Sequence, residues 1–188
     1  MNPDYQRLDE FTLPPGFRGR TGVTVQLWWL AQALLFAPSP QIMYGWRRFL
    51  LRLFGAKIGR NVLIRPSVTI TYPWKVTIGD HSWIGDGATL YSLGKIDIGA
   101  HAVLSHKVYL CAGAHDYTKR EFDILAPGIT VGEQVWIAND VFVAPGVSIG
   151  AGAVIGARSS VFSDLPPGMV CKGSPAKPYK ERVTRIHR

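Results

Sequence analysis

The chain has 188 residues, two cysteines and a formal net charge of +8. This length suffices for one well-packed domain, and two distant cysteines without a CxxC motif indicate neither a disulfide framework nor a zinc knuckle. The charge favours a polyanionic partner, either a phosphorylated small molecule or an acidic membrane surface. Nucleic acid is a weaker interpretation, because no basic run is interleaved with aromatics at a spacing that would follow a nucleic-acid backbone. Residues 1–20 are polar and rich in proline and glycine, so we expect no signal peptide and a cytoplasmic location.

Residues 1–55 form an N-terminal extension in which two helices are expected. The stretch 22–37 is uncharged and apolar but short for a membrane span, and Met43–Phe54 predicts a basic amphipathic helix. One interpretation is that both helices cap the open end of a repeat domain, and the other is that they attach to a bilayer surface. The two are compatible. The bilayer interpretation depends on the paired aromatics and the basic cluster, namely Trp28, Trp29, Arg47, Arg48 and Arg52.

From Ile58 onward an aliphatic residue returns every six positions. The series is Ile58, Ile64, Ile70, Ile78, Ile84, Leu90, Ile98, Leu104, Leu110, Val131, Ile137, Val143, Ile149, Ile155 and Val161. Six residues are three strand alternations and no helical multiple, so the pattern predicts short strands joined by tight turns. Ile58, Ile78 and Ile98 lie twenty residues apart, so three hexads with two corner residues make one coil of a β-solenoid.

The rhythm breaks between Leu110 and Val131. Residues 111–130 are therefore predicted to leave the solenoid as a protruding loop, and insertions of this kind carry function on a repeat scaffold. The β-helix domain is expected over residues 56–163, followed by a tail over 164–188 that forms a cap or a short helix.

Four histidines fall at positions that do not predict catalysis. His81 and His101 occupy the same place in successive coils and should stack at one corner, whereas His106 lies elsewhere in the repeat and His187 lies in the tail. A zinc site needs three convergent ligands, so we expect no metal.

His115 differs because it stands where the repeat fails, after small residues that leave room for a ligand. Near pH 7 a neutral imidazole can remove the proton of a hydroxyl that attacks an acyl carbonyl. Asp116, or a carboxylate from elsewhere, could orient the ring. Cys111 also lies in this loop, but its position after Leu110 favours a small buried filler over a nucleophile.

Several segments together resemble the hexapeptide-repeat acyltransferases, enzymes with a left-handed parallel β-helix that use acetyl-coenzyme A. The segments are Gly113–Tyr117, Ile129–Ile137, Pro145–Gly150, Asp164–Gly168 and Gly173–Lys177. The N-terminal residues Gln26–Trp29 and Pro38–Arg48 are similar to the colanic-acid-type exopolysaccharide O-acetyltransferases within that family. The resemblance implies homotrimers in which the loop histidine faces a neighbour's coils.

The resemblance also implies roles for individual residues. His115 matches the general base, and Trp136, Asn139, Ala157 and Lys180 match residues that line or close the coenzyme A tunnel. The segment Phe162-Ser163-Asp164 lacks a lysine that the family often has, so Lys172, Lys177 or Lys180 must meet the coenzyme A phosphates. Gly85 replaces an asparagine of galactoside-type relatives. The acceptor is therefore expected to meet Asp86, Asp116 and Tyr117 instead.

The sequence thus predicts an acetyl-coenzyme A-dependent O-acetyltransferase that acts on a sugar or a lipid-linked oligosaccharide of an exopolysaccharide precursor by direct transfer. A peripheral contact with the inner membrane face is part of this hypothesis. Two alternatives stay open, a metal-dependent hydratase resembling the γ-class carbonic anhydrases and a non-catalytic solenoid scaffold.

Overall fold

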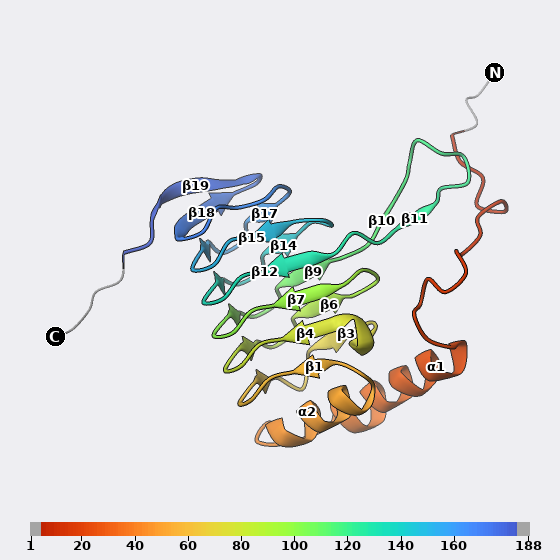
Figure 1. The fold of residues 1–188 in the computed structure, drawn as a ribbon, viewed down its shortest axis with the longest axis horizontal. Helices are drawn as coiled ribbons and strands as arrows, with labels where there is room; N and C mark the ends of the chain where they lie inside the picture. Colours follow the sequence, from red (N-terminus) through yellow and green to blue (C-terminus); the bar gives the residue numbers. More distant parts are fainter. Residues whose placement is uncertain (1–4, 184–188) are drawn as a thin grey trace.

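The computed structural model describes residues 5–183 and has the form of a parallel β-solenoid standing on two helices (Figure 1). The foot consists of α1 (Gly22–Ala31), the π-helical turn η1 (Gln32–Phe36) and α2 (Tyr44–Leu53). A single 3₁₀ turn, η2 (Pro73–Lys75), forms the corner between the first and second coils. The predicted mostly-β solenoid with N-terminal helices is confirmed.

Three sheets form the walls of the solenoid, and successive coils contribute one parallel strand to each of them. Sheet A contains β1 (Lys57–Ile58), β4 (Val76–Ile78), β7 (Ile96–Ile98), β12 (Ile129–Val131) and β15 (Ser148–Ile149). Sheet B contains β2 (Leu63–Ile64), β5 (Trp83–Ile84), β8 (Val103–Leu104), β13 (Trp136–Ile137), β16 (Val154–Ile155), β18 (Met169–Gly173) and β19 (Ala176–Glu181). Sheet C contains β3 (Thr69–Ile70), β6 (Thr89–Tyr91), β9 (Tyr109–Cys111), β14 (Phe142–Val143) and β17 (Ser160–Val161).

The six-residue repeat supplies the core. Every aliphatic residue of the series lies inside the solenoid, and the most exposed of them, Ile58, shows only 8% of its surface to solvent. Ile58 pairs with Ile78, and Ile78 with Ile98, so residues twenty apart stack on adjacent coils as the period predicts. A side chain from each strand thus continues one apolar ladder along the axis.

The corners between sheets A and B use a left-handed backbone conformation. His81 and His101 adopt it, with φ values of 59° and 56°. Their rings stack in parallel with centroids 5.1 Å apart, which confirms the predicted corner stack. The regular turn explains why both histidines point the same way.

The two helices cap the first coil, whose strands would otherwise present an open sheet edge. Trp28 is completely buried and donates its indole N–H to the carbonyl of Ile70 at 2.8 Å. Arg47 is also completely buried and donates to the Ile64 carbonyl at 2.6 Å. Burial lowers the pKa of its guanidinium group below the ordinary value. Backbone carbonyls at the open edge of this coil are therefore satisfied by side chains from the foot.

Arg48 and Arg52 complete this cap. Arg48 donates to the Val62 carbonyl at 2.9 Å, and Arg52 donates to the carbonyls of Ile58 and Gly59 at 2.8 Å. The expectation that Trp28 and the three arginines face a bilayer was wrong for Trp28 and Arg47, because both are buried and donate hydrogen bonds to backbone carbonyls of the first coil. Only Trp29 of the aromatic pair remains substantially exposed, at 43%.

The opposite end of the solenoid is closed by strands, where the sequence predicted a tail that forms a cap or a short helix. β18 pairs in parallel with β16, and β19 folds back antiparallel on β18. Sheet B therefore continues beyond residue 163, the expected end of the repeat domain. The described part of the tail adds apolar residues to the core through Cys171 and Ala176, which are buried.

The predicted protruding loop leaves the solenoid between β9 and β12. It forms a hairpin of β10 (Ala114–His115) and β11 (Ile124–Leu125), which projects from the coils in Figure 1. Within residues 5–183, no helix is long and apolar enough to cross a membrane.

Candidate functional site

His115 lies on the projecting hairpin, where β10 pairs with β11 and sets His115 opposite Ile124. Its Nδ1 lies 2.8 Å from the backbone carbonyl oxygen of Phe122. A carbonyl can only accept, so this contact assigns the Nδ1 proton and leaves Nε2 as the proton acceptor. The imidazole also stacks on the Phe122 ring, with centroids 4.2 Å apart and planes 7° apart.

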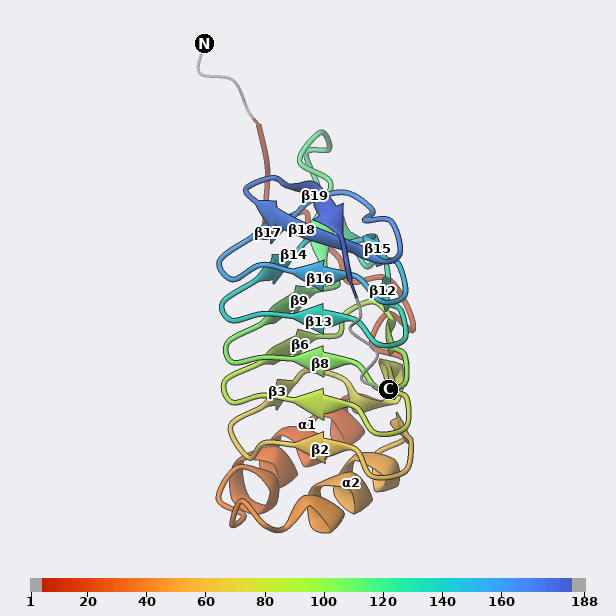
Figure 2. The same cartoon turned by 90° about the vertical axis from the view of Figure 1, so that its left-hand side faces the viewer.

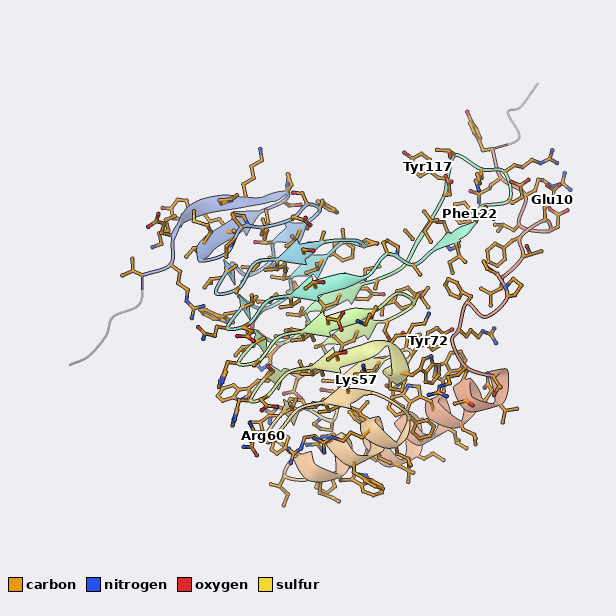
Figure 3. The ribbon with its side chains drawn as sticks, viewed as in Figure 1. Glu10, Lys57, Arg60, Tyr72, Tyr117 and Phe122 are labelled. Carbon is orange, nitrogen blue, oxygen red and sulfur yellow. The ribbon has the colours of Figure 1, made fainter. Side chains whose placement is uncertain are left out.

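The N-terminal segment braces the hairpin from outside. Arg7 donates its backbone N–H to the Arg120 carbonyl at 2.8 Å, and Arg120 forms an ion pair of 3.0 Å with Glu10. The ring of Phe11 lies 6.1 Å from that of His115. Figure 3 shows Glu10 beside the hairpin that carries Phe122. No sequence pattern predicts this contact, because its partners are about a hundred residues apart.

The residues predicted around His115 make local contacts within the loop. Asp116 accepts hydrogen bonds from the hydroxyl and the N–H of Thr118, which lower the pKa of its carboxyl. The Phe122 carbonyl, not Asp116, therefore orients the imidazole in this structure. Tyr117 is 83% exposed at the hairpin tip (Figure 3). Cys111 is a partly buried free thiol whose Sγ lies 3.3 Å from the Gly113 carbonyl oxygen.

Most of the predicted tunnel residues gather instead on sheet B. Trp136 is 47% exposed and stands in one cross-strand row with Val154, Val170 and Lys180. Three strand spacings separate Trp136 from Lys180, roughly 14 Å. Both residues line a hollow of about 580 Å³, which we call the upper hollow and which Arg182 also lines.

The other two predicted lysines lie on the same strand pair but do not line the upper hollow. Lys172 and Lys177 are opposite each other in β18 and β19. The Lys172 ammonium sits 3.7 Å from the centroid of the Tyr179 ring. Ala157 is exposed in the turn that follows β16.

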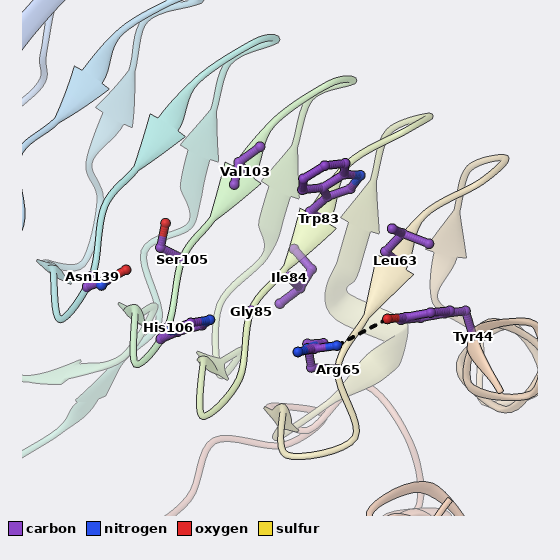
Figure 4. Close-up of a pocket in the computed structure, with 10 residues that line it drawn as sticks. All are labelled: Tyr44, Leu63, Arg65, Trp83, Ile84, Gly85, Val103, Ser105, His106 and Asn139. Carbon is purple, nitrogen blue, oxygen red and sulfur yellow. Dashed lines mark hydrogen bonds between the residues drawn. The ribbon is translucent and has the colours of Figure 1, made fainter. Parts of the chain in front are cut away.

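A second hollow of about 360 Å³ lies on sheet B nearer the foot, and we call it the lower hollow (Figure 4). Asn139, His106 and Ser105 line its upper part, and Trp83 and Tyr44 line the part toward α2. The indole N–H of Trp136 lies 3.1 Å from the Ser105 hydroxyl oxygen. Trp136 therefore stands at the junction of the two hollows.

Asp86 lies at the edge of the lower hollow and is engaged by its neighbours. Arg65 forms an ion pair of 2.7 Å with it, and Ser67 donates to its other oxygen at 2.8 Å. Partial burial raises the pKa of Asp86, but the hydrogen bonds of Arg65 and Ser67 outweigh that effect and lower the pKa overall. Arg65 also donates to the Tyr44 hydroxyl at 3.2 Å, which is the dashed line in Figure 4.

Gly85 lines the lower hollow at a point of close backbone approach. A Cβ at this position would lie 2.8 Å from the backbone carbonyl carbon of Ser105. An asparagine therefore has no room here without a shift of the adjacent coil.

A single chain keeps the two parts of the predicted site apart. The hairpin with His115 projects on one flank of the solenoid in Figure 1, and Figure 2, drawn from the opposite flank, shows sheet B facing the viewer. His115 and the sheet B residues therefore lie on different flanks of one chain. As for metals, no three His, Cys, Asp or Glu side chains within residues 5–183 cluster so that they could hold an ion.

Comparison with known proteins defines the class. The family model "Bacterial transferase hexapeptide (six repeats)" matches residues 128–163. Along almost its whole length the chain is similar to "Putative colanic acid biosynthesis acetyltransferase WcaF" of Escherichia coli strain K12, with 61% identity over 178 residues that cover 95% of this chain and 98% of the relative. This chain belongs to the hexapeptide-repeat acetyltransferases.

More distant relatives agree with this assignment. The galactoside O-acetyltransferase of Escherichia coli strain K12 is 30% identical over 138 residues, which cover 72% of this chain and 68% of the relative. The solved structure of a galactoside acetyltransferase in complex with coenzyme A superposes with a TM-score of 0.79 at 26% identity, covering 90% of this chain and 84% of the other.

Proposed function

We propose that this chain transfers the acetyl group of acetyl-coenzyme A to a sugar hydroxyl of an exopolysaccharide precursor, with His115 as the general base. The observation that carries the proposal is the contact between His115 Nδ1 and the Phe122 carbonyl, because it presents Nε2 as a proton acceptor on a projecting hairpin. The 61% identical relative is named as an acetyltransferase of colanic acid biosynthesis, which supports the reaction and the acceptor class.

The proposed reaction is a direct transfer within a ternary complex. The acceptor oxygen attacks the thioester carbonyl while Nε2 of His115 takes the hydroxyl proton. Backbone N–H groups of a neighbouring coil stabilise the oxyanion of the tetrahedral intermediate. Collapse of that intermediate breaks the carbon–sulfur bond, and the proton passes from His115 to the departing thiolate, which leaves coenzyme A as the free thiol.

The upper hollow is the proposed donor site. Trp136 offers an exposed indole on which the pantetheine arm can pack, and Lys180 and Arg182 supply positive charge for phosphates along the same row. Of the three lysines named from the sequence, Lys180 is thus the strongest candidate, and Lys172 and Lys177 stay proposals for the more distant phosphates. Asn139 and Ala157 lie in the turns that follow β13 and β16 of the same sheet B.

The lower hollow is the proposed acceptor site. Trp83 is 54% exposed there, and an aromatic face flanked by hydrogen-bonding groups suits a sugar ring. Asp86 and Arg65 can contribute hydrogen bonds at its edge, while the crowding at Gly85 supports an acceptor held differently from that of galactoside-type relatives. The acceptor is a sugar, free or carried on a lipid at a membrane surface.

A homotrimer completes the proposed site. A ring of identical chains brings the hairpin of one protomer to sheet B of the next at every interface. Asp116 and Tyr117, on the same hairpin as His115, would then approach the acceptor from the loop side.

A thermal-shift series with acyl-coenzyme A thioesters tests the donor assignment. Acetyl-coenzyme A should raise the melting temperature in proportion to the logarithm of its concentration, because it binds only the folded state. Longer acyl thioesters should stabilise less at equal concentration. If no thioester raises the melting temperature, the donor assignment fails and the scaffold alternative gains support; stoichiometric zinc in the purified protein would favour the hydratase.

A further inference from the structure

The foot of the solenoid presents an apolar surface on the side that faces away from the coils. Trp28, Leu50 and Leu51 are buried against the first coil, yet leucines on the outer side of the same helices are exposed. Leu34 and Leu53 show 62% and 66% of their surface. We call the exposed set Leu27, Leu30, Leu34, Leu35 and Leu53 the foot patch.

The foot patch is one continuous surface. All five leucines line a single hollow of about 400 Å³ between α1, η1 and α2. No charged residue occurs in α1 or η1. Monomeric proteins rarely expose a continuous apolar area of this kind unless it contacts a partner or a membrane.

Charge around the foot patch indicates what covers it. Residues 11–79, which include the foot and the first coil, contain nine lysines and arginines and no aspartate or glutamate. Two of the nine, Arg60 and Arg65, form ion pairs with Asp80 and Asp86 of the next coil. The rest of the chain has 12 basic against 13 acidic residues, so the positive excess of the chain is carried by residues 11–79. The backbone carbonyls that Arg48 and Arg52 contact carry no negative charge that would offset the positive charge of these side chains.

This combination favours an anionic lipid surface over a second copy of the chain. Two feet brought together would oppose their own positive charges, whereas acidic headgroups attract them. Both helices lie across the end of the solenoid in Figures 1 and 2, so their axes can lie in the plane of a bilayer with the leucines directed into it. We infer that the foot patch docks this protein on an anionic membrane surface.

The docking has a consequence for the acceptor, and this part rests on the proposed function. Tyr44, the first residue of α2, lines the lower hollow together with Arg65 and Trp83. The acceptor site therefore opens beside the docked end. A sugar still attached to its lipid carrier can enter the lower hollow while the carrier stays in the bilayer.

Vesicle flotation with the full-length protein tests the docking. Wild-type protein should float with vesicles of phosphatidylglycerol and phosphatidylcholine at low salt, and much less with phosphatidylcholine alone or at high salt. Leu34→Gln combined with Leu53→Gln should weaken binding at least about tenfold, because two inserted side chains become polar. Leu8→Gln with Leu13→Gln removes the same number of exposed leucines elsewhere and should leave binding unchanged.

Two results would overturn the docking. One is wild-type protein that ignores anionic vesicles at low salt, and the other is a foot-patch variant that still floats like wild type. Light scattering tests the alternative of a second copy. If the wild-type particle has twice the mass of the foot-patch variant particle, the patch is an interface between two copies. The acetyl-coenzyme A thermal shift of the same variant should equal that of wild type, so a failure of docking is distinguished from a failure of the proposed function.

Discussion

The coils and the hairpin of this protein are built on different principles. In the coils, Ile58, Ile78 and Ile98 stack on one another through parallel strand pairs, and all three are buried. In the hairpin, His115 is exposed, and the orientation of its ring depends on the Phe122 carbonyl and on the N-terminal segment around Phe11. The difference teaches that a periodic scaffold is locally specified, while the proposed general base is positioned by contacts that do not repeat.

Replacement of His115 should give the largest loss of activity. His115→Asn is expected to lower kcat by about 10²- to 10⁴-fold, because general-base assistance acts in the transition state, with little change in acetyl-coenzyme A affinity. Steady-state kinetics and donor thermal shifts measure the two quantities. Cys111→Ala is the control in the same loop and should keep most activity. Near wild-type turnover in His115→Asn would remove the general-base assignment, and a dead Cys111→Ala would point to an acyl-cysteine route.

A core substitution in the coils should act on stability and not on chemistry. Leu104→Ala removes a side chain that is 1% exposed and should lower the free energy of unfolding by about 2–5 kcal/mol through lost burial and a cavity. Leu125→Ala on the hairpin, where the side chain is 45% exposed, should cost less than about 1 kcal/mol. Urea denaturation compares them. Equal losses in both variants would mean that the hairpin is as integral to the fold as the coils.

Trp136 should affect donor binding more than the chemical step. Trp136→Ala is expected to raise the KM for acetyl-coenzyme A about tenfold and to lower kcat by a smaller factor, since an exposed indole gains contacts only when the donor packs on it. Initial rates over a range of donor concentrations separate the two constants. An unchanged KM would place the donor elsewhere.

The smallest predicted effect concerns the phosphates of the donor. Lys180→Ala should raise the KM severalfold, because Lys180 lines the hollow at Trp136. Lys172→Ala and Lys177→Ala, which remove the same charge outside that hollow, should change the KM less with acetyl-coenzyme A. Repeating the assay with the 3′-dephospho thioester identifies the phosphate involved. If dephosphorylation leaves all KM values unchanged, none of the three lysines contacts the 3′-phosphate.

The sequence predicted the coils closely because their cause is local. A period of six residues determines which side chains enter the core and where His81 and His101 stack. The hand of the helix was implied only by the family resemblance. The position of the protruding loop also followed from the break after Leu110.

The sequence predicted less of the site and of the two ends. The bond between His115 and the Phe122 carbonyl could not be foreseen, because a backbone atom carries no sequence signal and the hairpin register determines it. Arg47 was expected to face a bilayer, but the open edge of the first coil offers carbonyl acceptors that compete for it. The β18–β19 pair was missed because the hexad series stops at Val161 and the antiparallel return follows no repeat.

The central claim is that His115 of one protomer serves sheet B of another, and mixing two damaged variants tests it most directly. A His115→Asn chain keeps an intact sheet B, and a Trp136→Ala chain keeps an intact hairpin. The two variants are refolded together in equal amounts and assayed at low acetyl-coenzyme A. In randomly mixed rings, an intact hairpin meets an intact sheet B at about a quarter of the interfaces. The mixture should therefore recover about a quarter of wild-type activity. Activity no higher than the average of the two separate variants would contradict the claim and place both parts of the site within one chain.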